Sequence, residues 1–443
     1  MRILFVTLGF PPRGRFGTEF YTHQLVHGLR ARGHEALVLH PVRDGSKPRY
    51  AVEEAMEDGV RVLLLHNPGD AGKRFEPSYR DARVEQVFRG VLERTAPDVV
   101  HFTYLLWGLS VRLPCVAREA GVPSVVTLTD YGLLCHRGQM FDGNLERCGG
   151  PHPPEVCARC IREPGEHDLE PFPRLLKRAA VRALAVVGGA GRVVVAGDLA
   201  ARERAVGEAL EAASLLVAPT HGLAERFRAK GLGGEKLVEL VYAFDDAPYV
   251  AARKLPPPPA STGARFGFLA QFAPHKGLGT LLAATRLLHA RRPDDPWRVV
   301  LHGGPVQGRN RLYAQRVLRE RLLARVEIGA PFEPEDAPRV LAGFSALVLP
   351  SEWDENAPLS VLQARAIGVP VLGTNVSGIA EVLAPEEAQR LVAPGDARAL
   401  AARMEDVLDG RIARASAPGL PLSLADHLAK IESYYSRIAR GSR

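Results

Sequence analysis

Short apolar runs alternate with helical stretches along almost the whole chain of 443 residues. The expected strands include RILFVTL, ALVLH, VRVLLLH, DVVHF, PSVVTLT and SLLVAPT in the first half, and RFGFLA, WRVVLHG, RVEIGA, SALVLPS and PVLGT in the second. The expected helices cover residues 17–32, 83–94, 106–119, 198–213, 222–230, 278–290, 309–324, 358–367 and 397–408, and residues 191–197 are expected to form a further strand. Strands that alternate with helices predict parallel sheets with helices on both faces, so the chain is predicted to have an α/β fold.

The alternation is interrupted over residues 245–264, which contain four consecutive prolines. A proline run favours an extended, semi-rigid connector. We therefore expect two doubly wound domains, residues 1–244 and 265–423, joined by this linker. Residues 424–443 have the apolar spacing of an amphipathic helix and are expected to cross back onto the first domain. Ligands of open α/β sheets bind beyond the carboxyl ends of the strands, so both domains should face one cleft.

Composition and charge narrow the classes of protein. With 46% hydrophobic and 24% charged residues, the chain is not expected to be disordered or collagen-like. The formal net charge of +7 indicates an anionic partner, such as a nucleotide diphosphate, a phospholipid surface or nucleic acid. The first residues are typical of a strand rather than of a signal peptide, and no run reaches the roughly 18 apolar residues of a membrane span. We expect a cytoplasmic protein that is at most peripheral to a membrane.

Two loops in the second half are candidates for a ligand site at the cleft. Lys276 stands in APHKG, between an expected strand and an expected helix. A lysine beside a helix N-terminus suits a diphosphate, because the ammonium charge adds to the positive end of the helix dipole. Glu355 lies in the loop PSEWDENAPLS, and Gln363 follows on the next helix. The alternative role for Glu355 is to stabilise the N-terminus of that helix.

A glycine-containing loop, FPPRGRFGTE, joins the first strand to the first helix through Gly14 and Gly17. Such a loop lets an anion or a sugar oxygen approach backbone N–H groups. Its spacing is not that of a dinucleotide-binding fingerprint, and a plain tight turn is the alternative.

The motifs FPPRGRFGTE, DVVHF, GVPSVVTLTD, APHKG and PSEWDENAPLSVLQARAIGVPVLGTNVSGIAE, in this order, resemble the family-4 retaining glycosyltransferases of the GT-B fold, over nearly the whole chain. The resemblance implies that two Rossmann-like domains clamp a nucleotide-diphosphate sugar in the second domain and the acceptor mostly in the first. It implies catalytic roles for Glu355, Lys276 and Asp130. The implied donor-binding residues are Gly17, Gln271, Lys276, Glu355, Asn356, Ala357, Pro358, Leu359, Ser360, Gln363 and Glu381, and the implied acceptor-side residues are His101, Thr129 and Asp130.

Two of these residues have a plainer alternative. Glu381 can serve as a helix-capping carboxylate. His101 can pack or form hydrogen bonds at the end of its strand.

The chain departs from the family pattern at four positions. Gln271 stands where an arginine often joins the lysine on the diphosphate, and Gln363 stands where the second glutamate of the family motif is usual. Thr103 and Thr129 stand where histidines are common. These departures leave a second hypothesis open, a catalytically weak GT-B protein that binds nucleotide or glycan and supports a partner transferase.

Four cysteines fall close together as C-x12-C-x8-C-x2-C, at Cys135, Cys148, Cys157 and Cys160, within an expected insertion at about 131–170. This spacing predicts a structural zinc site in a cytosolic chain, where disulfides are disfavoured. Unlinked or redox-active thiols and an iron–sulfur cluster are the alternatives. No catalytic metal is expected.

A basic amphipathic stretch follows the cysteines, with Arg174, Lys177, Arg178 and Arg182. It suits an anionic membrane that carries a lipid-linked acceptor, and the alternative is a half-buried surface helix. The cysteine region lacks interleaved aromatic and basic residues, so nucleic acid is not an expected partner. The leading hypothesis is transfer of a sugar to a glycan or lipid-linked acceptor, with retention, at the cytosolic face of a bacterial inner membrane, in cell-surface polysaccharide or glycolipid synthesis.

Overall fold

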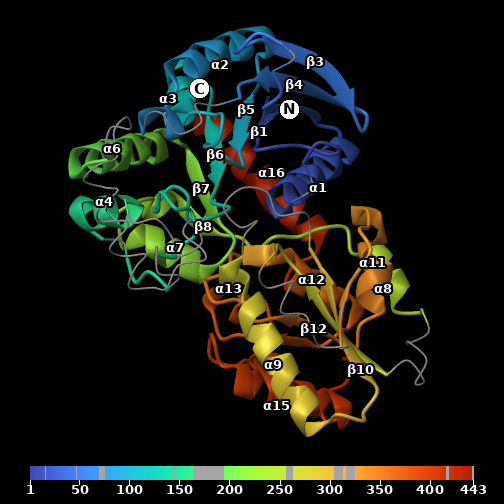
Figure 1. The fold of residues 1–443 in the computed structure, drawn as a ribbon. Coiled ribbons are helices and arrows are strands. Elements are labelled where there is room, and N and C mark those ends of the chain that lie inside the picture. The colour runs from blue at the N-terminus through green and yellow to red at the C-terminus, as the bar shows by residue number, and fades with distance from the viewer. Residues whose placement is uncertain are drawn as a thin grey trace.

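The computed structural model describes residues 1–14, 16–45, 47–68, 75–142, 146–150, 152–162, 194–255, 263–303, 313–315, 325–415 and 419–441. Two α/β domains lie one above the other in Figure 1, the first at the top and the second at the bottom. The predicted fold class, GT-B with two Rossmann-like domains, is confirmed.

The first domain is built on an eight-stranded sheet with the order β3-β4-β2-β1-β5-β6-β7-β8. The strands are β1 (Arg2–Val6), β2 (Glu35–Val42), β3 (Val52–Glu57), β4 (Val60–His66), β5 (Val99–Phe102), β6 (Ser124–Thr127), β7 (Leu215–Ala218) and β8 (Leu237–Glu239). Every neighbouring pair is parallel except β3 and β4. The β3–β4 hairpin was not expected from the sequence. Its signal is the dipeptide Asp58-Gly59, a two-residue hairpin turn.

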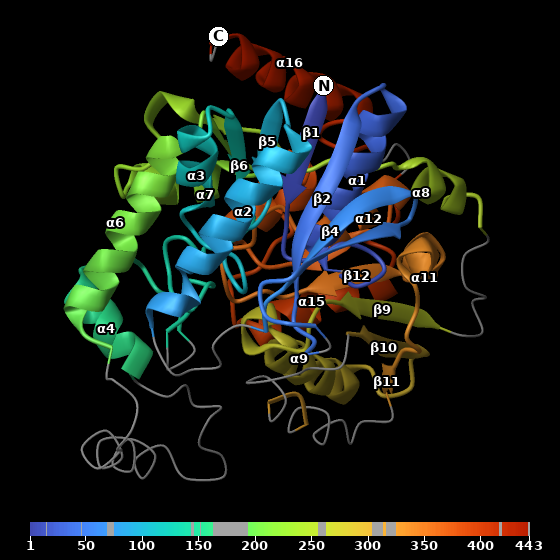
Figure 2. The ribbon, with the colours of Figure 1, turned by 90° about the horizontal axis from the view of Figure 1, so that it is seen from above.

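Helices cover both faces of this sheet (Figure 2). The helices of the first domain are α1 (Gly17–Ala31), α2 (Ala82–Thr95), α3 (Leu113–Glu119), α4 (Pro154–Arg162), α6 (Ala196–Ala212) and α7 (His221–Arg228), with short 3-10 turns η1 (Glu76–Ser78) and η3 (Gly234–Lys236). Of these, α4 packs on α6. The strands are buried on both faces, as in β1, where four of the five residues are fully buried. This burial explains why they appear in the sequence as continuous apolar runs.

The second domain has a five-stranded parallel sheet with the order β11-β10-β9-β12-β13. Its strands are β9 (Ala264–Leu269), β10 (Trp297–His302), β11 (Val326–Ile328), β12 (Ala346–Leu349) and β13 (Val371–Gly373). Its helices are α9 (Leu278–Arg291), α11 (Ala337–Ala342), α12 (Leu359–Ile367), α13 (Ser377–Ala380), α14 (Pro385–Ala388) and α15 (Ala397–Leu408), with 3-10 turns η5 (Pro274–Lys276) and η6 (Pro334–Asp336).

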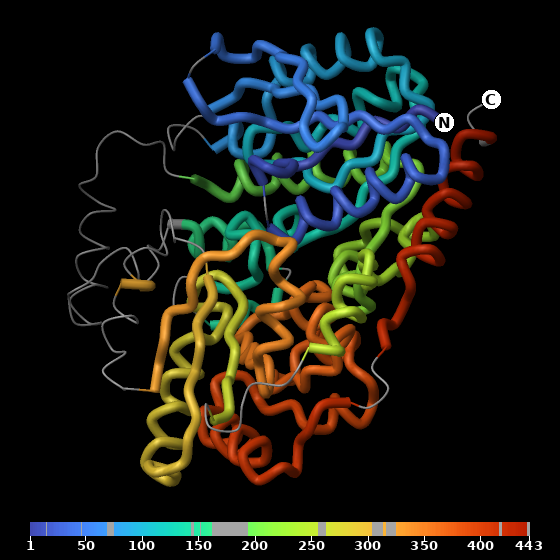
Figure 3. The backbone as a smooth tube through the Cα atoms, turned by 90° about the vertical axis from the view of Figure 1, so that its right-hand side faces the viewer, coloured from blue at the N-terminus to red at the C-terminus, as the bar shows by residue number. Residues whose placement is uncertain are grey.

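Two segments connect the domains. The region expected to be an extended linker contains a short helix, α8 (Ala247–Ala252), which packs on α11 and α12 of the second domain. Here apolar contacts of Tyr249 and Ala252 override the expectation of an extended chain. The prolines at 256–259 lie outside the described residues. The last helix, α16 (Leu424–Gly441), runs from the second domain up along the first (Figure 3).

The α16 helix joins the two domains through one apolar cluster. Leu428, Ile431 and Tyr435 of α16 belong to the same buried cluster as Phe5 in β1 and Leu347 in β12. Because the cluster is continuous, the relative position of the two domains is supported by packing and not by the linker alone.

Two sequence expectations about single elements need correction, and a third falls outside the described residues. Residues 106–119 are not one helix: α3 begins only at Leu113, after a turn in which Trp107 and Gly108 have positive φ angles of 57° and 103°. Pro114 suits the first turn of α3, because the missing N–H is not needed there. In the stretch expected to be a strand at 191–197, the described residues contain no strand, and α6 begins at Ala196. The expected helix at 309–324 lies almost wholly outside the described residues.

Candidate functional site

The strand order of the second sheet brings two predicted donor loops together. β9 and β12 are parallel neighbours at the point where the strand numbering reverses direction. Loops that leave the carboxyl ends of strands at such a switch point diverge and make room for a ligand. Lys276 follows β9 and Glu355 follows β12. The topology therefore places both residues at one edge of the sheet.

Lys276 and Glu355 form an ion pair. The Nζ atom of Lys276 lies 2.8 Å from Oε1 and 2.9 Å from Oε2 of Glu355. The side chain of Glu355 is 3% exposed and that of Lys276 is 16% exposed. Ser351 donates its hydroxyl hydrogen to Glu355, and the centre of the Trp353 ring lies 4.7 Å from the Lys276 ammonium. The ammonium is held in place before any ligand arrives, with three N–H donors to share.

Two glycines make this arrangement possible. Gly277 has a φ angle of 71°, and a Cβ atom there would lie 1.7 Å from the carbonyl oxygen of Pro350. A Cβ atom at Gly378 would lie 1.8 Å from the carbonyl oxygen of Glu355. No side chain fits at either position, so these glycines let the start of α9 and the start of α13 approach the loop after β12.

The loop after Glu355 leads into α12 through five predicted donor residues. The side chains of Asn356 and Ala357 are buried, and Ala357 has a positive φ angle of 49°. Pro358 precedes the helix, and Leu359 and Ser360 form its first turn. The first N–H groups of a helix have no acceptor within it and carry the positive end of the dipole. Leu359 and Ser360 can thus offer backbone N–H groups to an anion.

Both glutamines that were expected to depart from the family pattern lie in these predicted donor segments. Gln271 is exposed directly after β9, and Gln363 is buried in α12. The amide of Gln363 can both donate and accept hydrogen bonds, as contacts with a sugar hydroxyl require.

Residues of the first domain meet this loop from the other side. The Asn356 side chain donates to the Thr129 carbonyl oxygen at 3.3 Å. Asp354 forms ion pairs with Arg147 and, at 3.0 Å, with Arg226. A Cβ atom at Gly17 would lie 3.6 Å from Leu359, so the start of α1 lies against the start of α12. Asp354 and its two arginines could not be predicted from the sequence, because no local pattern marks charges that pair across domains.

Glu381 is also a cross-domain contact. Its carboxylate accepts hydrogen bonds from the backbone N–H groups of His221 at 2.5 Å and Gly222 at 2.9 Å. These groups begin α7, where a negative charge is favourable. The structure therefore places Glu381 as a cap on a helix of the other domain, in keeping with its alternative role.

Asp130 and Thr129 lie at the carboxyl end of β6, where the acceptor side was predicted. The Asp130 carboxylate accepts a hydrogen bond from the Gly132 N–H at 2.7 Å. Burial raises the pKa of Asp130 to about 6, although that hydrogen bond and the charge of Arg202 act in the opposite direction. The Thr129 hydroxyl donates to the carbonyl oxygen of Thr103. A small pocket here is lined by Thr103, Tyr104, Leu105, Leu106, Val126, Thr127, Leu128, Thr129, Asp130 and Leu133.

His101 lies in the core, directly behind the pocket at the predicted acceptor side, because its partner Thr127 lines that pocket. It is fully buried, with Nδ1 2.6 Å from the Tyr435 hydroxyl and Nε2 2.7 Å from the Thr127 hydroxyl. Burial lowers the pKa of His101 to about 3. Both ring nitrogens hold α16 on β5 and β6, in keeping with the alternative role of His101 as a hydrogen-bonding residue near the end of its strand.

The four predicted zinc ligands do not form a cluster in the described structure. Cys135 and Cys148 lie in the loop between β6 and α4, and Cys157 and Cys160 lie on α4. All four are free, half-buried thiols. Burial raises the pKa of Cys157 to about 11, so this thiol is protonated at neutral pH. The structure does not support the predicted zinc site, or an iron–sulfur cluster in its place, because the four thiol groups do not come together as one set of metal ligands.

The basic stretch with Arg174, Lys177, Arg178 and Arg182 lies outside the described residues. Among the helices that are described, none combines the length and the apolar character that a membrane crossing needs.

Two family descriptions together match most of the chain. Residues 16–242 match "Glycosyl transferase 4-like domain", and residues 256–417 match "Glycosyl transferases group 1". The curated relatives include the D-inositol 3-phosphate glycosyltransferases of Corynebacterium urealyticum, 33% identical over 155 residues, and of Corynebacterium glutamicum, 28% identical over 144 residues. These matches cover 34% and 32% of this chain. The chain spans about a third of the relatives' length, 36% and 34%.

Solved structures resemble the whole chain. Sucrose-phosphate synthase from Thermosynechococcus elongatus has a TM-score of 0.60 at 16% identity, covering 99% of this chain and 96% of that one. Starch synthase IV from Arabidopsis thaliana bound to ADP and acarbose has a TM-score of 0.59 at 13% identity, covering 99% of each chain. Anabaena HepE in complex with UDP and glucose has a TM-score of 0.57 at 17% identity, covering 99% and 95%. At these identities the likeness shows the fold. The family matches go further: this chain belongs to the glycosyltransferases of group 1, with a GT-B fold and a glycosyl transferase 4-like first domain.

Proposed function

We propose that this glycosyltransferase takes a sugar from a nucleoside-diphosphate donor and transfers it with retention of configuration. The observation that carries the proposal is the buried Lys276–Glu355 pair at the switch point of the second sheet. Anabaena HepE, which shares the fold, has been solved with UDP-glucose, and this supports a donor of the same class.

The roles follow from charge and position. Lys276 and the first N–H groups of α12 would stabilise the negative charge that grows on the diphosphate as the sugar leaves. Glu355 would contact the donor sugar, and Gln363 the ribose. In a front-face reaction the leaving diphosphate oxygen accepts the proton of the attacking hydroxyl, so the protein mainly positions two substrates. Such a reaction needs no catalytic metal.

The acceptor is proposed to be a glycan or a lipid-linked glycan at the cytosolic face of a bacterial membrane, in cell-surface polysaccharide or glycolipid synthesis. The pocket bordered by Thr129 and Asp130 would receive its hydroxyl. The net charge of +7 favours a peripheral contact with an anionic membrane. The second hypothesis, a weak enzyme that supports a partner transferase, rests on Gln271 and Gln363 in the donor segments.

A thermal-shift screen against UDP, GDP, ADP and their sugars tests donor binding. A ligand at a hundred times its Kd stabilises the fold by about 2.7 kcal/mol. We expect one nucleotide series to raise the Tm of the wild type and of Lys230→Met, and not of Lys276→Met. Lys230 is the matched control, because it pairs with Glu203 at 3.2 Å and is 25% exposed. If no nucleotide shifts the Tm, or if Lys276→Met responds as the wild type does, the proposal is wrong.

Hydrolysis of the identified donor then separates the two hypotheses. We expect slow release of the sugar by the wild type, with the anomeric configuration of the donor retained, and loss of this release in Glu355→Gln with nucleotide binding kept. Nucleotide binding without any sugar release from the wild type would support the weak-enzyme hypothesis. Release with inverted configuration would contradict the proposed stereochemistry.

A further inference from the structure

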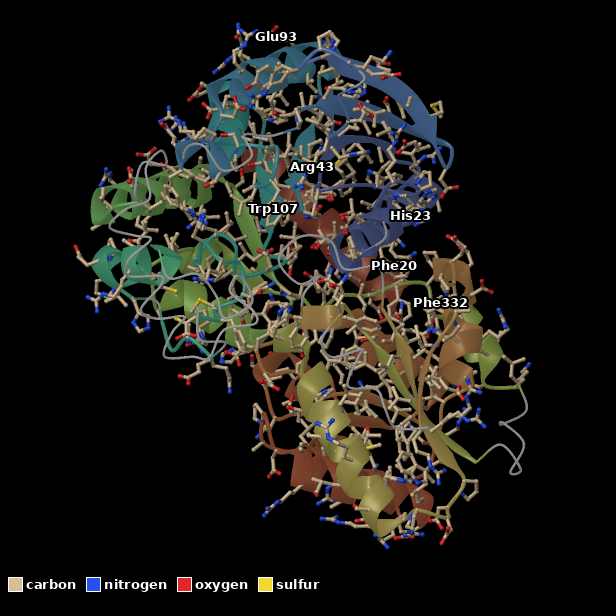
Figure 4. All side chains as sticks on the ribbon, in the orientation of Figure 1. Phe20, His23, Arg43, Glu93, Trp107 and Phe332 are labelled. Carbon is tan, nitrogen blue, oxygen red and sulfur yellow. The ribbon has the colours of Figure 1, made fainter. Side chains whose placement is uncertain are left out.

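Three side chains outside the donor site bring their ligand atoms to one point on the first domain. His23 and His27 lie on α1, and Asp58 lies at the turn of the β3–β4 hairpin. Their ligand atoms all lie within 4.8 Å of one another, and this is the one such group of three among the described residues. Figure 4 labels His23 on α1.

The helix fixes the two histidines. A spacing of four residues places both on one face of α1, because the helix turns once in 3.6 residues. Their ring centroids are 4.2 Å apart. Leu25 and Val26, which lie between them in sequence, are fully buried and hold this part of α1 on the sheet.

The hairpin fixes the third residue. Asp58 and Gly59 have φ angles of 46° and 67°, as a two-residue turn between antiparallel strands requires. The turn therefore presents the Asp58 carboxylate toward α1 at a set position. An ion pair between Arg13 and Glu57, at 2.6 Å, ties the same hairpin to the loop after β1.

The distances suit a shared ligand. The Nε2 atom of His23 lies 2.7 Å from Oδ2 of Asp58, and that of His27 lies 3.1 Å from the same oxygen. The Nε2 atom of His27 is shielded from solvent, and although it lies 3.1 Å from the Asp58 oxygen, the two groups are not aligned for a hydrogen bond, so this nitrogen has no hydrogen-bond partner among the described residues. The Asp58 oxygen thus forms a hydrogen bond with His23 and none with His27. A single cation, in contrast, would bind this oxygen and both Nε2 atoms.

We propose that His23, His27 and Asp58 form a binding site for a divalent transition metal of the zinc class. Two imidazole nitrogens and one carboxylate oxygen are ligands that zinc accepts, with water in the fourth position. Arg30 lies nearby, since a Cβ atom at Gly59 would lie 3.9 Å from its guanidinium, and its positive charge would weaken the site.

The ion would join the hairpin to α1. The ring of Phe10, in the loop after β1, lies 5.5 Å from that of His23. This loop leads to Gly17 at the start of α1, which faces Leu359 of the second domain. A metal here would therefore brace the loop that borders the donor site, without itself touching the Lys276–Glu355 pair.

Metal titration of the full chain after treatment with a chelator tests the proposal. We expect His27→Ala and Asp58→Asn to bind one equivalent of Zn²⁺ or Ni²⁺ less than the wild type, or to bind it more than about 100-fold more weakly, because loss of an outer-shell partner alone costs 10–100-fold. Asparagine tolerates the positive φ angle at position 58, so Asp58→Asn should fold. The quantity measured is the difference in bound metal between the wild type and each variant. Metal bound elsewhere on the chain is the same in both proteins and does not affect this difference.

The matched control is His221→Gln, because His221 pairs with Glu239 at 3.1 Å and belongs to no group of three ligands in the described part of the chain. Zinc at a hundred times its Kd should raise the Tm of the wild type and of His221→Gln by about 3 °C or more, and should not raise that of Asp58→Asn. Arg30→Gln should bind the metal more tightly. Equal stoichiometry and affinity in the wild type and both ligand variants, or no metal bound by the wild type, would overturn the proposal.

Discussion

Acidification should loosen the packing of α16 on the first domain, and His101 is the residue that tests this. Its pKa is lowered by burial to about 3, against an ordinary value near 6.5. As the pH falls below 6.5, the unfolded chain binds a proton at this residue that the folded chain does not bind. The stability that depends on neutral His101 is therefore complete above pH 6.5 and is lost progressively as the pH falls toward 3.

The magnitude follows from these two values. Between pH 7 and pH 5 the loss is about 2 kcal/mol for His101, and it is about the same for His427, whose pKa burial lowers to about 4. His427 lies in the same interface, with Nε2 3.0 Å from the Tyr21 hydroxyl. Asp130 acts in the opposite sense. Because its pKa is raised, the folded state takes up a proton between pH 7 and pH 5 that the unfolded state does not, and this offsets about 1 kcal/mol of the lost stability.

The assay is equilibrium unfolding in urea at pH 7 and pH 5 at constant ionic strength. His101→Gln keeps a donor and an acceptor in place of the imidazole and removes the titration. The wild type should lose about 2 kcal/mol more on acidification than His101→Gln does. His221→Gln is the control, since His221 is 65% exposed, and it should behave as the wild type does. Equal losses in the wild type and His101→Gln would refute the reasoning, and His427→Gln provides a second, independent comparison.

Two further predictions concern the loop after β12. Asp354→Asn removes the charge that pairs with two arginines of the first domain. We therefore expect a larger radius of gyration by small-angle X-ray scattering and a lower Tm. An unchanged radius would show that these ion pairs do not hold the domains together. Gly378→Ala puts a Cβ atom 1.8 Å from the carbonyl oxygen of Glu355 and should cost at least about 2 kcal/mol of unfolding free energy. Its control, Gly207→Ala in α6, meets its nearest atom at 3.9 Å and should be tolerated, so equal Tm values for the two variants would contradict the packing argument.

Motif identity and strand periodicity made the meeting of Lys276 and Glu355 predictable. Lys276 and Glu355 each follow a buried apolar strand, and parallel strands end at one edge of their sheet, so their side chains could be expected to meet. The glycine next to Lys276 is also a local signal, because only glycine fits against the chain there. The β3–β4 hairpin also has a local signal in the sequence, the dipeptide Asp58-Gly59, although its antiparallel strands depart from the strand–helix alternation around it.

The sequence alone determined the α/β class, the two domains and the loops that hold the proposed donor residues, because these depend on patterns within a few residues of one another. Tertiary structure decided what each isolated polar residue does. His101 lies near the end of a strand that leads to the predicted acceptor side, yet it is buried in the core, where it forms a hydrogen bond with Tyr435, far along the chain. Glu381 caps a helix of the other domain, and four closely spaced cysteines do not converge. Hydrogen-bond partners that are hundreds of residues apart in the chain cannot be recognised from a local sequence pattern, because only the packing of the two sheets and α16 determines which side chains meet.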